Sequence, residues 1–294
     1  MRQWGRLSLE LLFVALLYTA VGVVLGVFSV GWGSPIDVTR LLLQNLLALI
    51  PLVFFIWKAD GPWWSVGGTC ALALALLQVV VPRMEMLLER GQTLIQLPVL
   101  ALNAVGAAAA AVAALMMMLR PWNDGDSMPP YFWPAGAPLS YFWRIPAVVV
   151  VAGVAHMMAA VIGRTLVGQT GRPAVVIELM DKTALGFLVA LAAFVCAAHL
   201  GVRSPRRVQV LVGILGVVPA IGRLQQAAGS PFGYMLPRVG LRVLADLVVG
   251  LLSAILFLVA VSSRQHLEVP LRGGERPDGE PGEDDPEETA YSGS

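Results

Sequence analysis

Apolar residues in this chain come in long runs, separated by short segments rich in charged residues, proline and tryptophan. A helix that crosses the hydrocarbon core of a bilayer needs about 20 mostly apolar residues. Backbone polar groups in hydrocarbon also need internal partners, so runs of this length predict membrane helices. Eight runs qualify: 9–29, 41–57, 63–81, 97–119, 144–166, 182–202, 207–222 and 241–262. Run 207–222 is the shortest, and it either spans the membrane or enters it without crossing.

Two proline marks recur in the two halves of the chain. Val80-Val81-Pro82 ends the third run and Leu97-Pro98 opens the fourth, while Val217-Val218-Pro219 and Leu236-Pro237 mark the seventh and eighth. The shift is 137 residues at the first mark and 139 at the second. Chance is the alternative, since apolar runs align readily with one another. A duplication of four runs would give parallel repeats, because four is an even number.

The predicted fold class is therefore all-α: a polytopic membrane helix bundle of about eight transmembrane helices in two parallel four-helix repeats. The first repeat covers 1–119 and the second covers 144–264, joined by a loop at 120–143 that is rich in proline and aromatic residues. The tail at 265–294 holds nine acidic residues and two arginines among many glycines and prolines. Such a segment buries too little apolar surface to offset its ordering entropy, so we expect it to be disordered.

Composition supports a membrane protein. Of the 294 residues, 57% are hydrophobic and 13% are charged, whereas soluble domains are about 25% charged. The mean hydropathy is +0.75. Bases near the ends of spans favour the cytoplasmic side, and the tight basic turn at 203–207 is the strongest such signal. We therefore expect an integral protein of the cell (inner) membrane with both termini in the cytoplasm.

Recognised catalytic motifs are absent from the sequence, which has no HExxH, GxSxG, P-loop or dinucleotide-binding pattern. The three histidines have no metal-ligand spacing, and each of the two cysteines lies in an apolar run. No metal or cofactor is predicted, and an enzyme is the less favoured class. The bases are scattered along span ends, which argues against nucleic-acid binding. The expected partners are the lipid bilayer and an unidentified solute or protein.

Charged residues in or beside the spans are the candidate functional groups, because their burial in a membrane is costly. Four groups stand out: Glu85 and Glu89 after the third run, Glu178, Asp181 and Lys182 at the start of the sixth, Arg242 and Asp246 in the eighth, and His156 and Arg164 in and after the fifth. Each also has a structural interpretation. These are, in the same order, an interfacial amphipathic helix, an anchored helix end, an intrahelical ion pair, and a hydrogen-bonded packing histidine.

Polar residues at corresponding places in the two halves favour a transporter or permease-like protein. Gln44-Asn45 in one half stands opposite Lys182-Thr183 in the other at a shift of 138 residues. Transporters built from repeats place their substrate site at the repeat interface, so these residues and Asp181 would face a shared cavity. A membrane scaffold or complex subunit, with the acidic tail as a tether, is the alternative. An intramembrane lipid-modifying enzyme is the weaker alternative.

Overall fold

The computed structural model describes residues 2–28, 35–59, 63–89, 94–119, 144–166, 175–200, 205–227 and 232–259. All the regular elements in these ranges are helices. The first half of the chain contributes α1 (Arg2–Val24), α2 (Pro35–Lys58), α3 (Trp63–Leu74), η1 (Ala75–Val80), α4 (Val81–Glu89), η2 (Leu94–Gln96) and α5 (Leu97–Leu119). The second half contributes α7 (Arg144–Leu166), α8 (Val175–Leu200), α9 (Pro205–Val212), η3 (Gly213–Val217), α10 (Val218–Ala227), α11 (Phe232–Ala254) and η4 (Ile255–Val259).

Seven stretches of the described residues are long and apolar enough to cross a membrane, which is the character of a membrane-embedded protein. They are Gly5–Val24, Asp37–Lys58, Trp63–Leu88, Leu94–Leu119, Arg144–Leu166, Val208–Gln225 and Val239–Phe257. The short run at 207–222 is thus part of a stretch that is long enough to span. The predicted sixth span falls in α8, whose apolar part is the shorter stretch Lys182–Ala197. Seven of the eight predicted spans are therefore confirmed as helices of spanning length. The remaining one, the sixth span at 182–202, stays a prediction.

A π-helical turn precedes each of the two Val-Pro marks. The turn η1 ends at Val80, directly before Val81-Pro82, and η3 ends at Val217, directly before Val218-Pro219. Proline has no N–H to donate, and its ring crowds the carbonyl four residues earlier in a regular helix. The wider turn of a π-helix makes room for that carbonyl. As a result α3, η1 and α4 form one continuous rod, and α9, η3 and α10 form another.

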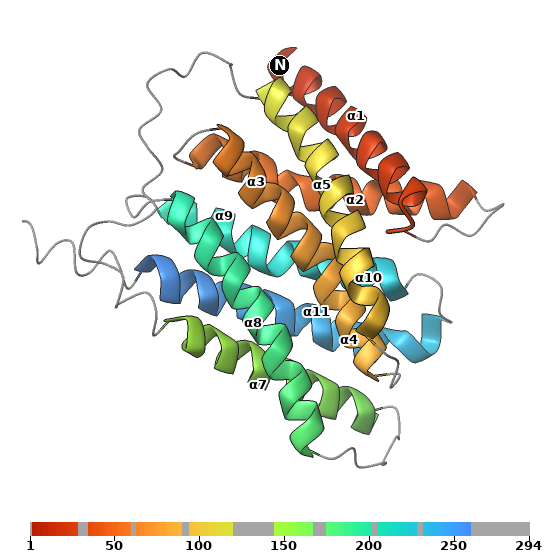
Figure 1. The fold of residues 1–294 in the computed structure, drawn as a ribbon, viewed down its shortest axis with the longest axis vertical. Helices are drawn as coiled ribbons and strands as arrows, with labels where there is room; N and C mark the ends of the chain where they lie inside the picture. Colours follow the sequence, from red (N-terminus) through yellow and green to blue (C-terminus); the bar gives the residue numbers. More distant parts are fainter. Residues whose placement is uncertain are drawn as a thin grey trace, which may run out of the picture.

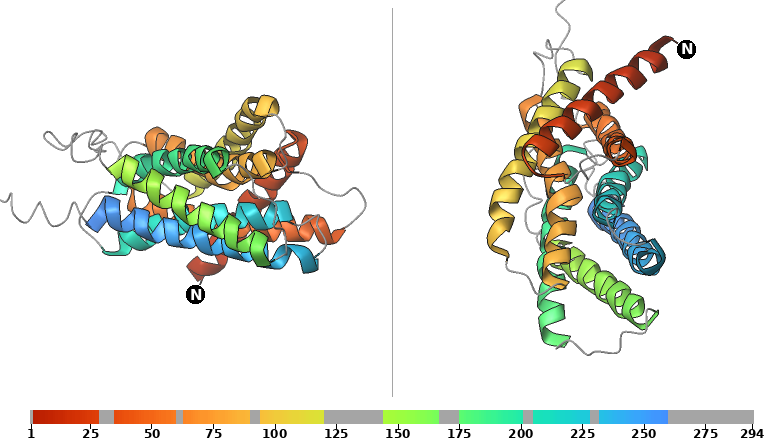
Figure 2. Two further views of the ribbon diagram at one scale, coloured as in Figure 1. Left: turned by 90° about the horizontal axis from the view of Figure 1, so that it is seen from below. Right: turned by 90° about the vertical axis from the view of Figure 1, so that its right-hand side faces the viewer.

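The halves of the chain are grouped in space and meet along the two rods. In Figure 1 the first half (red to yellow) lies above the second half (green to blue), with α4 and α10 at their junction. In Figure 1 and in the right-hand view of Figure 2, α1 and α7 lie at opposite ends of the molecule. Across the junction α10 packs on η1 and α4, α2 packs on α9 and α10, and α8 packs on α3 and α4. One large hydrophobic core includes residues from both halves.

Glycine allows the closest approach at this junction. A Cβ atom added at Gly222 of α10 would overlap the carbonyl oxygen of Gln78 in η1 and would lie 2.9 Å from Cγ of Pro82. The two rods therefore touch backbone to backbone at the place where Pro82 follows the π-helical turn. This contact brings the polar side chains on both rods within reach of one another.

Candidate functional site

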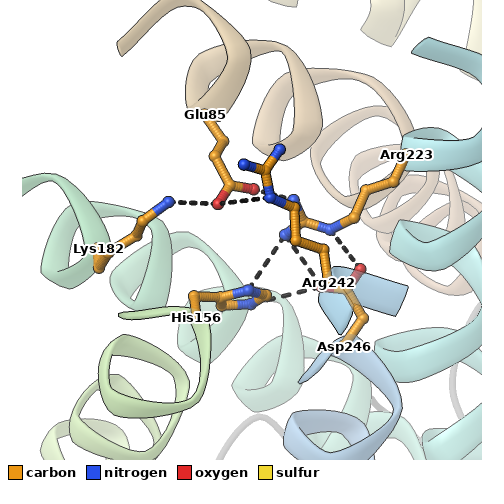
Figure 3. A network of polar contacts seen from close by, with 6 residues as sticks. All are labelled: Glu85, His156, Lys182, Arg223, Arg242 and Asp246. Carbon is orange, nitrogen blue, oxygen red and sulfur yellow. Dashed lines mark hydrogen bonds and ion pairs between the residues drawn. The ribbon is translucent and has the colours of Figure 1, made fainter. Parts of the chain in front are cut away.

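Six ionisable side chains from five helices meet next to the junction (Figure 3). We call them the charged cluster: Glu85 from α4, His156 from α7, Lys182 from α8, Arg223 from α10, and Arg242 and Asp246 from α11. Five of the six residues are at most 5% exposed, and the side chain of Arg242 is 19% exposed. His156 and Asp246 lie about midway along α7 and along the continuous helix of α11 and η4. The cluster is thus sequestered in the interior of the helix bundle.

Arg223 is at the centre of the cluster. Its Nε donates to Oδ2 of Asp246 over 2.5 Å, and its Nη2 donates to Oδ1 of the same carboxylate over 3.1 Å. Its Nη1 donates to Oε2 of Glu85. The planar guanidinium suits this arrangement, because it offers donors in a fixed fork that can bind one carboxylate with two bonds and a second carboxylate from another edge.

Glu85 is the one member of the charged cluster that belongs to the first half of the chain. Its Oε1 accepts a hydrogen bond from Nζ of Lys182, while its Oε2 faces Arg223. Nε of Arg242 lies 4.0 Å from the same Oε1. Three cations from three helices of the second half therefore surround a single carboxylate from the first half.

His156 is held in one tautomer by its neighbours. Its Nδ1 lies 3.3 Å from Nη2 of Arg223. Because arginine carries only donors, Nδ1 must be the acceptor, and the proton of the neutral ring is on Nε2. That Nε2 lies 3.4 Å from Oδ1 of Asp246, yet it makes no hydrogen bond to any described residue. An N–H donor is thus buried beside a carboxylate that Arg223 already holds.

A second polar network, which we call the amide network, contains no charged group. It consists of Tyr18 and Thr19 of α1, Asn45 of α2, Gln78 of η1 and Gln225 of α10. Gln78 Nε2 donates to Asn45 Oδ1 over 2.9 Å and to Gln225 Oε1 over 3.1 Å. Gln225 Nε2 donates to the same oxygen of Asn45 over 2.7 Å, and Tyr18 donates to Gln78 Oε1. The amides therefore satisfy one another inside the bundle.

The two networks share the two rods that form the junction. Gln78 and Glu85 belong to the rod of the first half, and Arg223 and Gln225 belong to the rod of the second half. Gly222, at the backbone contact, directly precedes Arg223. A displacement of one rod against the other would therefore strain both networks together.

Five of the nine residues that the sequence singles out meet in the charged cluster: Glu85, His156, Lys182, Arg242 and Asp246. Arg164 is partly buried near the end of α7 and is not among the residues of the cluster. The side chains of Glu89, Glu178 and Asp181 lie outside the part of the chain that the structure describes.

Arg223, Gln225 and Gln78 were not among the candidate site residues predicted from the sequence. Arg223 comes one residue after the end of the predicted run 207–222, whereas α10 continues to Ala227. Gln78 is the one amide residue in the apolar run 63–81, and its position there was the available signal. Gln78 and Arg223 lie on the two rods that contain the recurring Val-Pro marks.

The charged cluster offers paired cations and carboxylates and no metal-ligand set. Among the described residues no group of three or more histidine, cysteine or acidic side chains is arranged to hold a metal ion. Alternating cations and carboxylates can instead bind and release a small charged solute. Comparison with known proteins finds no matching family model, curated protein or solved structure.

Proposed function

We propose that this chain is a transporter or permease-like protein of the cell membrane, and that its solute binds at the charged cluster between two parallel four-helix repeats. The observation that carries the proposal is the burial of ion-paired side chains from both halves of the chain at one point inside a membrane protein. Ionisable residues buried in membrane bundles commonly mark pathways for solutes, ions or protons.

The energetic cost of burying charged side chains supports a solute-binding role for the charged cluster. Replacing a buried ion pair by well-packed apolar residues is often neutral or stabilising, by about 1–4 kcal/mol. The cluster is therefore a poor device for holding the helices together, and apolar side chains would do that with less desolvation. A site that must bind and release an ionic solute needs such groups, because apolar residues offer no charge to recognise.

The pairing of helices supports the repeats. In the first half α1 packs on α2 and α5, and α5 also packs on α3 and η1. In the second half α7 packs on α8 and α11, and α11 also packs on α9, η3 and α10. The two halves therefore share most of these pairings in the same chain order, and the contact of α10 with α11 is the one that has no equivalent among them. The π-helical turn before each Val-Pro mark adds a local feature that both halves share.

Buried polar residues also stand at corresponding positions. Lys182 lies 137 residues after Asn45, and His156 lies 137 residues after Thr19. This is the shift that separates Pro82 from Pro219, and it pairs Lys182 with the buried Asn45 rather than with the partly exposed Gln44. We therefore interpret the amide network and the charged cluster as two copies of one location, of which only the second carries charge.

The exchange of side chains between the halves supports a site at their interface. Glu85 of the first half completes the charged cluster of the second, and Gln225 of the second half completes the amide network of the first. Repeat-built transporters place their substrate at the interface between repeats, where rigid-body movement of one repeat against the other alternates access. Both polar networks would change partners in such a movement.

Proteoliposomes test this function. Purified protein should take up at least one member of a labelled panel of organic acids, amino acids and amines. Asp246→Asn and Lys182→Met should abolish uptake because they remove charge from the cluster. Glu10→Gln is the matched control, since Glu10 pairs with the exposed Arg6 at the surface of α1. Normal uptake by folded Asp246→Asn and Lys182→Met proteins would refute the site, and failure to move any solute would refute transport.

A further inference from the structure

We infer that the solute is a small carboxylate anion, and that Glu85 occupies the place of the solute carboxylate in this structure. This inference deepens the proposed transport function and rests on it, because Glu85 leaves its place only when the two halves move apart. Glu85 would then act as a tethered stand-in that neutralises the site whenever solute is absent.

The surroundings of the Glu85 carboxylate support this role. Lys182 and Arg242 lie on the side of Oε1, and Arg223 binds Oε2. Each oxygen thus meets its own cation, which is the recognition that a free carboxylate would need. These cations lie on α8, α10 and α11 of the second half, while Glu85 lies on α4 of the first. The binding groups and the bound carboxylate therefore belong to parts of the chain that can separate.

The charges of the six clustered side chains favour an anion. Counted by themselves and with His156 neutral, these six comprise the three cations Lys182, Arg223 and Arg242 and the two carboxylates Glu85 and Asp246, a formal charge of +1. Removal of Glu85 raises this charge to +2. A cation entering such a site is repelled by like charges, whereas a carboxylate restores the balance that Glu85 provided.

Asp246 does not compete for the same role. It binds Arg223 with two hydrogen bonds and faces His156, and all three belong to the second half. It would therefore stay with the cations when the halves separate, and it would fix the orientation of the guanidinium. Glu85 is the carboxylate that joins the halves, and it is the one that a solute can replace.

The apolar neighbours of Glu85 favour a solute with an aliphatic part. A separate small hydrophobic cluster is formed by Val81 and Met84 of α4 and Leu185 of α8, with Leu188 packed against it. Val81 and Met84 lie four residues and one residue before Glu85, and Leu185 follows Lys182 by three residues. Separation of α4 from α8 would expose this apolar surface beside the cations. A short aliphatic acid matches both features.

The direction in which Glu85→Gln changes the affinity for butyrate tests the inference. Purified protein in detergent is titrated with butyrate, butylammonium and inorganic phosphate, and binding is measured by isothermal calorimetry and thermal stabilisation. Glu85→Gln removes the internal competitor with nearly unchanged shape, so butyrate should bind at least about tenfold more tightly than to the wild type. Lys182→Met in the Glu85→Gln background should reverse that gain. Glu10→Gln should bind as the wild type does.

Other outcomes overturn the inference. Weaker or equal butyrate binding by Glu85→Gln, or preference for butylammonium, would show that Glu85 contributes to a cation site or has only a structural role. Tighter binding of phosphate than of butyrate would overturn the carboxylate assignment. Glu85→Asp provides a second variant should Glu85→Gln fold poorly, because its shorter carboxylate competes less well and butyrate affinity should rise by a smaller factor.

Flux measurements separate this inference from the proposed function. Uptake of an amine and not of an acid would leave transport standing and refute the carboxylate. The expected binding pattern without uptake of any solute would leave an anion site and refute transport. Uptake of butyrate that Glu85→Gln alters, together with the binding pattern above, supports both.

Discussion

Gly222→Ala is the substitution for which the structure sets the clearest expectation. The added methyl carbon would overlap the carbonyl oxygen of Gln78 and would lie 2.8 Å from its carbonyl carbon and 2.9 Å from Cγ of Pro82. Two of these three atoms are backbone atoms, which cannot rotate away. The rods at the junction must therefore move apart, by roughly 1.5 Å, to bring the carbonyl oxygen to ordinary van der Waals contact at about 3.5–4.0 Å.

The magnitude follows from two opposing contributions. Overpacking of a well-packed interior costs about 1–3 kcal/mol, while alanine in place of glycine stabilises a helix interior by about 1 kcal/mol. A separation of that size also stretches the Gln78–Gln225 hydrogen bond of 3.1 Å beyond hydrogen-bonding range. Losing it costs about a further 1 kcal/mol. We expect a net destabilisation of roughly 1–3 kcal/mol, together with loss of uptake.

Unfolding of the purified protein in mixed micelles, with SDS as the denaturant, measures this change. Gly68→Ala is the matched control, because Gly68 lies in α3 and a Cβ there meets no atom within 4 Å. The control should be as stable as the wild type or slightly more so. Equal stability and equal uptake for Gly222→Ala and Gly68→Ala would refute the close backbone contact and its role in aligning the two networks.

Three further predictions concern the networks and the topology. Lys182→Met should destabilise the protein by about 3 kcal/mol, which is at the low end for a broken buried ion pair because Arg223 still binds Glu85. Adding Glu85→Gln should recover part of this loss in a double-mutant cycle. Strictly additive effects of the two substitutions would argue against direct pairing. Gln225→Leu should cost about 1–3 kcal/mol in the same unfolding assay by leaving amides of the other half unsatisfied, and an unchanged midpoint would contradict the amide network. A reporter fused after Ser294 should be active in the cytoplasm, as the basic turn at 203–207 predicts, and activity confined to the other side would reverse the proposed orientation.

The membrane helices could be predicted from the sequence because the bilayer imposes one simple requirement, a long apolar run, on every span. His156 and Asp246 could be predicted as candidates for the same reason, since an ionisable residue inside such a run stands out. Arg223 could not, because it follows its run by one residue and resembles a loop base. Hydropathy marks where a run becomes polar, and it does not report that a helix continues past that point.

The partners of the charged residues were also beyond the reach of sequence spacing. Spacings of four residues predicted ion pairs within a helix, as for Arg242 with Asp246 and Glu178 with Lys182. In the structure Asp246 binds Arg223 of α10 and Lys182 binds Glu85 of α4, while the side chain of Glu178 lies outside the part of the chain that the structure describes. Periodicity describes neighbours along one helix only. Contacts between helices depend on how the rods cross, which is decided by features such as the glycine at 222.

The π-helical turn in η1 determines what a deletion of one residue would do to the position of Glu85. A regular α-helix advances about 100° per residue, so a wide turn that accommodates an additional residue rotates everything beyond it by a similar angle. Gln78 lies within that turn and Glu85 lies beyond it. Deleting one residue from η1 would turn this part of the rod into regular α-helix and swing the Glu85 carboxylate to another side, with each of its cations still in place. The number of residues in η1 thus determines the direction in which the Glu85 carboxylate points, and therefore which cations it can bind.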